Sequence, residues 1–141
     1  MDGSFPGAGL LPGAGGIFFS TTLSGGPQGA GTVFKLAPGG TETVLFSFDA
    51  FRGPGGFAPG SSLVRDAKGN LYGTAWGGGN GGDGTVFEIT PTGQEAVLHS
   101  FSGSPDGQDP RGPLTSIAGS LYGTTILGGA SNCGTVFKLA R

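Results

Sequence analysis

The sequence predicts an all-β protein made of three copies of one unit, and two observations lead to this expectation. The tetrapeptide Gly-Thr-Val-Phe occurs at 31–34, 84–87 and 134–137, so its starts lie 53 and 50 residues apart. Short apolar runs alternate with Gly- and Pro-rich turns, and no segment has a helical period. A period of roughly 50 residues is typical of solenoids, propellers and arrays. Four strands per unit favour the blade of a β-propeller.

The middle copy shows the elements of one unit most clearly. We name its strands A to D in chain order and expect them at 62–65, 70–76, 85–89 and 95–101. Tight turns at 66–69 and 91–93 join A to B and C to D, with Gly and Pro where a bend needs them. A Gly-rich loop at 77–83 joins B to C. Each unit therefore reads as a four-stranded antiparallel sheet.

The other two copies repeat this pattern with one omission. Each unit has a proline four residues before a leucine: Pro6 and Leu10, Pro59 and Leu63, Pro110 and Leu114. Each unit also has an aromatic residue in strand B, Phe19, Tyr72 or Tyr122, and we expect these aromatic residues in the core. The strand D block Val-Leu-x-Ser-Phe occurs at 44–48 and 97–101 and has no third copy. The sequence thus predicts one domain, 1–141, with repeats at about 1–53, 54–105 and 106–141, the third lacking its outer strand.

Three blades are too few to surround an axis, since propellers close with about 4 to 8. Both end blades would expose an apolar face, and such faces drive association. We therefore expect the chain to partner itself head to tail. A homodimer would give six blades and is favoured, while a homotrimer would give nine.

Composition excludes several classes of function. The net charge is −2 with 11% charged residues, so no basic patch is available for nucleic acid. No apolar stretch approaches the roughly 18 residues of a membrane span, and the first residues lack the pattern of a signal peptide. Localisation stays open. Cys133 is the single cysteine and cannot form an intramolecular disulfide, so it is either a small loop residue or a reactive or bridging thiol.

The loops suggest where a ligand could bind. In an up-and-down blade, the B to C and D to A connections lie on one face, and here they are long and differ among the copies. Variable loops on a fixed scaffold commonly carry binding sites. The alternative is that they are solvated turn residues. The candidates are Arg52, Phe57, Trp76, Asn80, Asp83, Asp106, Gln108, Asp109, Arg111 and Asn132.

Motifs for other chemistry are weak. The glycines at 77–84 resemble a phosphate cradle, but no Gly-Lys-Ser/Thr follows. The segment 106–109 offers carboxylates for calcium or for an Asx turn, without the EF-hand spacing. His99 fits a strand better than a catalytic triad, and Asp83 could form a glycosidase pair with Asp106 or Asp109. We predict no catalytic residue, metal or cofactor.

The order Leu-Tyr-Gly-Thr, a Gly- and Asn-rich loop, Gly-Thr-Val-Phe-Lys-Leu and Val-Leu-His-Ser-Phe resembles the tandem repeat of the GloVer-containing bacterial proteins. The resemblance covers nearly the whole chain, although the first copy has Ile-Phe-Phe-Ser at 17–20 in place of a Leu-Tyr-Gly block. It implies a β-propeller and an extracellular or cell-surface setting. It carries over no functional residue.

These observations favour a non-catalytic interaction or scaffold module. We expect it to assemble into a closed ring and to bind a polar ligand, a glycan or a protein, on the loop face, because aromatic platforms beside polar groups suit such ligands. Two alternatives stay open: a purely structural repeat that only assembles, and a carbohydrate-active hydrolase or lyase.

Overall fold

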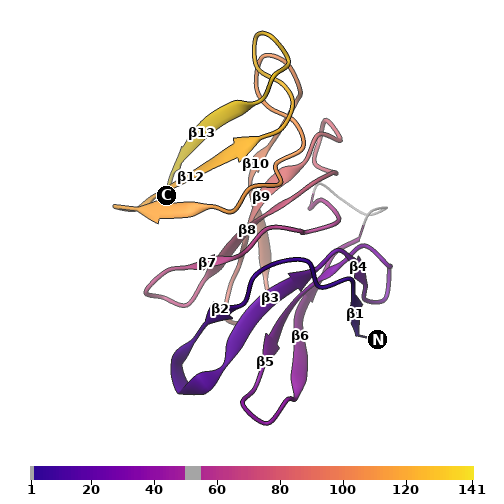
Figure 1. Ribbon diagram of the computed structural model, residues 1–141, viewed down its shortest axis with the longest axis vertical. Helices are drawn as coiled ribbons and strands as arrows, with labels where there is room; N and C mark the ends of the chain where they lie inside the picture. Colours follow the sequence, from indigo (N-terminus) through magenta and orange to yellow (C-terminus); the bar gives the residue numbers. More distant parts are fainter. Residues whose placement is uncertain (1, 50–54) are drawn as a thin grey trace.

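A computed structural model of the chain describes residues 2–49 and 55–141, and it is built from antiparallel sheets (Figure 1). The sheets follow one another in chain order. Blade 1 contains β2 (Leu11–Pro12), β3 (Phe18–Thr22), β5 (Thr32–Leu36) and β6 (Glu42–Ser47). Blade 2 contains β7 (Val64–Arg65), β8 (Leu71–Ala75), β9 (Thr85–Ile89) and β10 (Glu95–Ser100). Blade 3 contains β11 (Thr115–Ile117), β12 (Ser120–Thr125) and β13 (Thr135–Ala140).

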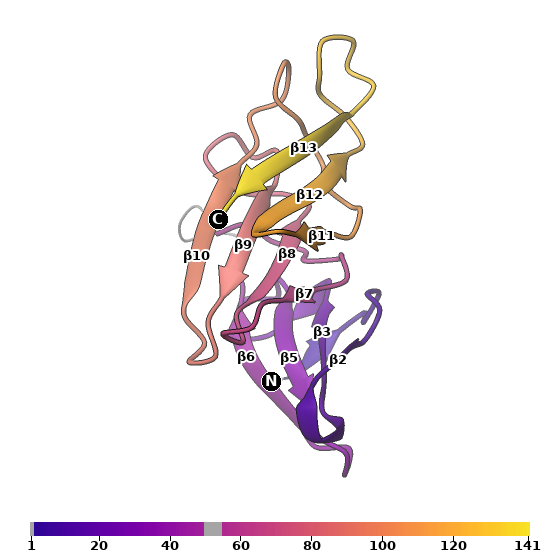
Figure 2. The ribbon, with the colours of Figure 1, turned by 90° about the vertical axis from the view of Figure 1, so that its left-hand side faces the viewer.

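The all-β class and the missing outer strand of the third blade are thereby confirmed. Figure 2 shows the three sheets stacked face to face, each turned relative to the one before. A short 3₁₀ turn, η1 (Ala14–Gly16), joins β2 to β3. Among the described residues, no helix is long and apolar enough to cross a membrane.

Strand positions within a blade agree closely with the sequence pattern, with one difference at strand A. We expected strand A at 62–65, but β7 begins only at Val64. Before Val64, a side chain of this segment contacts β8: the backbone N–H of Thr74 donates to the hydroxyl of Ser61 (3.0 Å). Leu63 is buried in the core cluster between blades 1 and 2. Side-chain contacts therefore replace the first half of this strand.

Strand D carries the same irregularity in both blades that have it. Val44 pairs with Phe34 and Phe46 with Val33, so one residue between them is unpaired. In blade 2, Val97 pairs with Phe87 and His99 with Val86. A bulge of this kind bends a strand and increases its twist.

The connection from strand D to strand A also repeats in all three copies. Phe5, Ala58 and Asp109 have φ of 57°, 54° and 59°, and each precedes a proline. Their carbonyls accept hydrogen bonds from the B to C loop of the same blade at 3.1, 3.3 and 3.2 Å. In blade 1, β1 (Gly3–Ser4) of this connection pairs with β4 (Ser24–Gly25) of the B to C loop. The first residues thus form a D to A connection.

The hydrophobic core consists of two clusters, one at each junction between blades. Val33 of blade 1 and Leu63 of blade 2 belong to the first. Their counterparts, Val86 and Leu114, belong to the second. A phenylalanine after strand D also crosses each junction edge-on to a ring of the next blade: Phe48 to Phe87 at 5.0 Å between centroids, and Phe101 to Phe137 at 5.2 Å. Equivalent residues thus build equivalent junctions.

At the two ends of the array, the same positions face solvent. Val136 is 82% exposed, whereas its counterparts Val33 and Val86 are 0% exposed. Leu10 is 55% exposed, whereas Leu63 and Leu114 are buried. We call the exposed side of blade 1 around Leu10 the first end face, and the exposed side of blade 3 around Val136 the second.

Candidate binding pocket

A shallow pocket of about 310 Å³ opens on the loop side at the junction of blades 2 and 3. Its walls come from the D to A connections and the B to C loops of blades 2 and 3. The lining residues are Phe57, Trp76, Gly77, Gly82, Asp83, Gln108, Asp109, Arg111 and Leu127. Six of these are residues that the loop argument selected from the sequence.

The centre of the pocket is a stacked tryptophan and arginine. Trp76 follows β8 directly, and its indole packs over Gly60, where an added Cβ would lie 2.6 Å from the ring. The guanidinium of Arg111 covers the ring at 4.2 Å from its centroid, within the range of a cation–π contact. Within the described part of the chain, the buried indole N–H has no acceptor.

Asp109 holds the arginine in this position. Its carboxylate accepts a hydrogen bond from Nε of Arg111 at 2.8 Å. This hydrogen bond, together with the negative charge of Asp109, raises the pKa of Arg111 above its ordinary value. The backbone N–H of Asp109 donates to the carbonyl of Asp83 at 2.9 Å, which ties blade 3 to blade 2. Asp109 is therefore held through its backbone by Asp83, and its side chain in turn holds Arg111.

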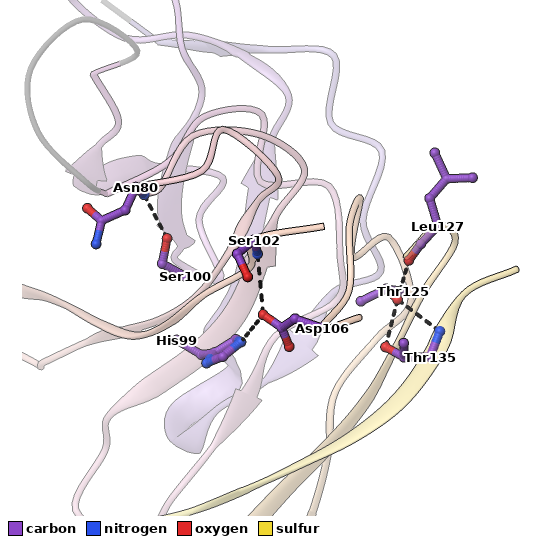
Figure 3. Close-up of polar contacts among 8 residues, drawn as sticks. All are labelled: Asn80, His99, Ser100, Ser102, Asp106, Thr125, Leu127 and Thr135. Carbon is purple, nitrogen blue, oxygen red and sulfur yellow. Dashed lines mark hydrogen bonds and ion pairs between the residues drawn. The ribbon is translucent and has the colours of Figure 1, made fainter. Parts of the chain in front are cut away.

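The opposite wall is built from matched backbone pairs. Phe57 exchanges backbone hydrogen bonds with Gly77, and its ring lies over that glycine, which leaves no room for a side chain there. Gln108 exchanges the equivalent bonds with Leu127 at 2.9 and 3.1 Å. The carbonyl of Leu127 also accepts the hydroxyl proton of Thr125 (2.8 Å, Figure 3). These contacts make the wall rigid.

The other predicted residues do not reach the pocket. Asp106 accepts hydrogen bonds from His99 Nε2 (3.0 Å) and from the backbone of Ser102 (3.3 Å), as Figure 3 shows. The side chain of Asn132 accepts the backbone N–H of Gly128 and so closes its own loop. Asn80 is exposed, and its backbone N–H donates to Ser100.

Arg52, the remaining candidate, lies outside the described residues. Sequence reasoning missed Leu127, Gly77 and Gly82. Leu127 could have been found, because it occupies the position of Gly77 in the third copy.

Chemically, the pocket offers an aromatic surface, one cation, two carboxylates and an amide. Asp109 already neutralises Arg111, and Asp106 is engaged with His99 instead of facing Asp83. Among the described residues, no three His, Cys, Asp or Glu side chains gather as metal ligands. Because Gly60 and Arg111 cover the Trp76 ring, the aromatic surface open to a ligand is that of Phe57, which is 39% exposed. The arrangement suits a polar ligand that hydrogen-bonds beside this ring.

A second hollow, of about 430 Å³, lies on the tight-turn side of the same junction. Asp66 is its central acid and accepts hydrogen bonds from the Tyr72 hydroxyl (2.8 Å) and from Asn70 (2.9 and 3.1 Å). Desolvation alone would raise the pKa of Asp66, but these hydrogen bonds outweigh it and lower the pKa below 3.8. Desolvation and the bond to Asp66 raise the pKa of Tyr72. The network orders the turn between β7 and β8.

Comparison with known proteins places this geometry in context. The sequence model of the Gloeobacter/Verrucomicrobia repeat matches residues 2–141. None of the curated proteins compared with the chain matches it. An X-ray structure of a protein provisionally assigned as a gluconolactonase is similar in fold, with a TM-score of 0.56 and 17% sequence identity. The similarity covers 83% of this chain and 40% of that chain. It supports the β-propeller fold of the three blades.

Proposed function

Because the chain belongs to the Gloeobacter/Verrucomicrobia repeat family and folds as three blades of a β-propeller, we propose that it is a non-catalytic interaction module that closes into a ring with a second copy. The ring presents the Trp76 pocket on its loop face as a site for a polar ligand, either a glycan or a protein.

One observation carries the proposal of self-assembly: the exposed end faces are made of residues that are buried at the two internal junctions. Val136 is a copy of the fully buried Val33 and Val86, and Leu10 is a copy of Leu63 and Leu114. A second chain can therefore offer each end face the surface that its counterparts already bury. Burying such apolar area is the main favourable term in protein association.

The internal junctions also predict a register for the proposed contact. Ala58 N–H donates to Ala30 at 2.8 Å across the first junction, and Asp109 donates to Asp83 at 2.9 Å across the second. The third pair of this series is Phe5 of one chain with Cys133 of another. In the ring, the Phe5 N–H donates to the Cys133 carbonyl, and Pro6 lies over Gly134, as Pro59 lies over Gly31.

Two copies are favoured over three by the length of the similar solved chain. Since 83% of this chain matches 40% of that chain, the solved chain is about twice as long. Two copies of the present chain supply the same length and six blades.

Light scattering tests the assembly directly. The purified chain should have about twice the mass of 13.8 kDa. A monodisperse monomer at micromolar concentration would contradict the proposal, and three times the mass would replace six blades with nine.

Disulfide formation tests the register. In Phe5→Cys, the new thiol should pair with the native Cys133 of another chain under mild oxidation, giving a covalent dimer on a non-reducing gel. The matched control is Leu98→Cys, which is also exposed but lies in β10, the outer strand of the middle blade, away from either end face. Equal cross-linking of both variants would show random collision instead of a defined contact.

Glycan arrays and protein capture would test the ligand site, each compared with Trp76→Ala. The variant should lose binding and keep the mass of the assembled ring, because Trp76 belongs to a loop and not to either end face. Loss of both would make Trp76 a core residue. Absence of any ligand would favour the purely structural alternative, in which the repeat only assembles.

A further inference from the structure

The third blade has an open edge at β13. In blades 1 and 2 the equivalent strands, β5 and β9, pair on both sides, and their outer partners are β6 and β10. Within the described residues, β13 pairs only with β12. Such an edge carries unpaired backbone donors and acceptors and can accept a further strand.

We infer that this edge binds an extended segment with the pattern of strand D, Val-Leu-x-Ser-Phe, added antiparallel to β13. Two internal examples define this partner. The segments at 44–48 and 97–101 share the pattern, the pairing and the bulge at the leucine that follows the valine. The inference is independent of whether the ring closes, because it concerns an edge and not an end face.

The register of the added strand follows from β9 and β10. Val97 pairs with Phe87, His99 with Val86 and Ser100 with Thr85. The corresponding residues of β13 are Phe137, Val136 and Thr135. The added valine therefore pairs with Phe137, and the added serine pairs with Thr135.

Blade 3 has a backbone carbonyl in position to accept a hydrogen bond from the phenylalanine that ends the pattern. Phe48 N–H donates to Gly31, and Phe101 N–H donates to Gly84, both at 2.9 Å. Gly134 is the third copy of this glycine. Its carbonyl accepts no backbone hydrogen bond from the described part of the chain.

Blade 3 also has the glycine and the backbone N–H that would contact the serine of the pattern. In blade 2 the Ser100 hydroxyl lies against Gly79 and accepts the backbone N–H of Asn80 at 2.7 Å (Figure 3). Blade 3 has Gly129 at the position of Gly79, with the same left-handed backbone, and Ala130 supplies the N–H. The unpaired edge of β13, the carbonyl of Gly134 and the serine contact at Gly129 therefore all fit a segment with the pattern of strand D.

A labelled peptide with the sequence of residues 94–102 tests this inference. Its fluorescence anisotropy should rise saturably on titration with the protein, and hydrogen exchange should slow in β13 and remain unchanged in β11, which lies at the opposite edge of the same blade. The matched control peptide carries an N-methyl group on the amide of the Phe101 position. It lacks only the donor for Gly134 and should bind more weakly.

Binding that is equal for a scrambled peptide, or saturation without slower exchange in β13, would overturn the inference. So would a β13 that is already protected in the free protein and binds no peptide. Light scattering on the same samples reports ring closure separately, so a monomer that binds the peptide would retain this inference and reject the ring.

A chain extended in cis provides a second measurement. Replacing the residues after Leu139 with the turn and strand of residues 90–102 should raise the melting temperature, because Leu139 corresponds to Ile89. The same extension with Asp at the position of Phe101 should raise it less. An equal rise for both extensions would count against strand addition.

Discussion

At the scale of single residues, a left-handed backbone recurs once in each blade, at Phe5, Ala58 and Asp109. A residue with a Cβ costs roughly 1 to 2 kcal/mol in this conformation. The conformation recurs because it aims the N–H of Ala58 at Ala30 in the preceding blade and its carbonyl at Trp76 in its own. Strain at one residue thus joins two loops and two blades.

Ala58→Gly should therefore stabilise the fold. Glycine occupies a positive φ without steric cost, so we expect a gain of about 0.5 to 1 kcal/mol in the free energy of unfolding, measured by denaturant titration. Ala96→Gly is the matched control, since Ala96 is exposed in the middle of β10. That change should destabilise, and a loss of stability in Ala58→Gly would contradict the strain argument.

Asp66 makes stability depend on acid pH. Because its pKa in the folded state lies below the ordinary 3.8, its ionised form stabilises the fold above that pH, and this contribution is lost as pH falls through the lowered pKa. Asp66→Asn should unfold more easily than the native chain at neutral pH, and the difference should shrink in acid. Thermal unfolding across this range measures it. Glu42→Gln on the exposed start of β6 is the control, and an equal pH dependence in both variants would contradict the assignment.

At the scale of elements, one blade is held to the next by aromatic edges. Phe87 is fully buried and receives Phe48 edge-on from blade 1. Its ring also covers Gly73 of the neighbouring strand, where an added Cβ would lie 2.6 Å away. The glycine in β8 thus provides the space that the phenylalanine in β9 fills.

Phe87→Ala should cost roughly 3 to 5 kcal/mol, the range for a buried phenylalanine. Chemical denaturation measures the loss. Ile117→Ala removes an exposed apolar side chain and should change stability little. If both variants lost the same small amount, the junction would not depend on this ring.

The strands could be predicted from the sequence because each is specified locally. A Gly-Thr-Val-Phe run and its flanking turns define β9 to the residue. The clustering of Trp76, Asp83 and Arg111 was also predictable, since loops of two kinds share one face of every blade. The hydrogen bond between Asp106 and His99 could not be predicted, because it depends on how a bulged strand meets the following loop in space. The coverage of Trp76 by Arg111 depends on the rotation between blades, which no local pattern encodes.

At the scale of the whole molecule, the proposed ring depends on the second end face. Val136→Asp should give a monomer, because ring closure would bury the new carboxylate without a partner. Light scattering reports the mass, and circular dichroism should show an unchanged fold, since Val136 is exposed in the single chain. Leu98→Asp, in the outer strand of the middle blade, is the control and should keep the assembled mass. A ring that persists in Val136→Asp would place the contact elsewhere.

The Trp76 pocket lies at a single junction within one chain. The proposed ring of two chains would therefore hold it twice, on the same face and on opposite sides of the axis. A ligand with repeated epitopes, such as a polysaccharide, could then engage both pockets. The second contact is intramolecular, and linked contacts of this kind can strengthen attachment by about 10² to 10⁴ without any new interaction. Weak single sites would suffice to hold a long polymer, and short oligomers of the same sugar would be released readily.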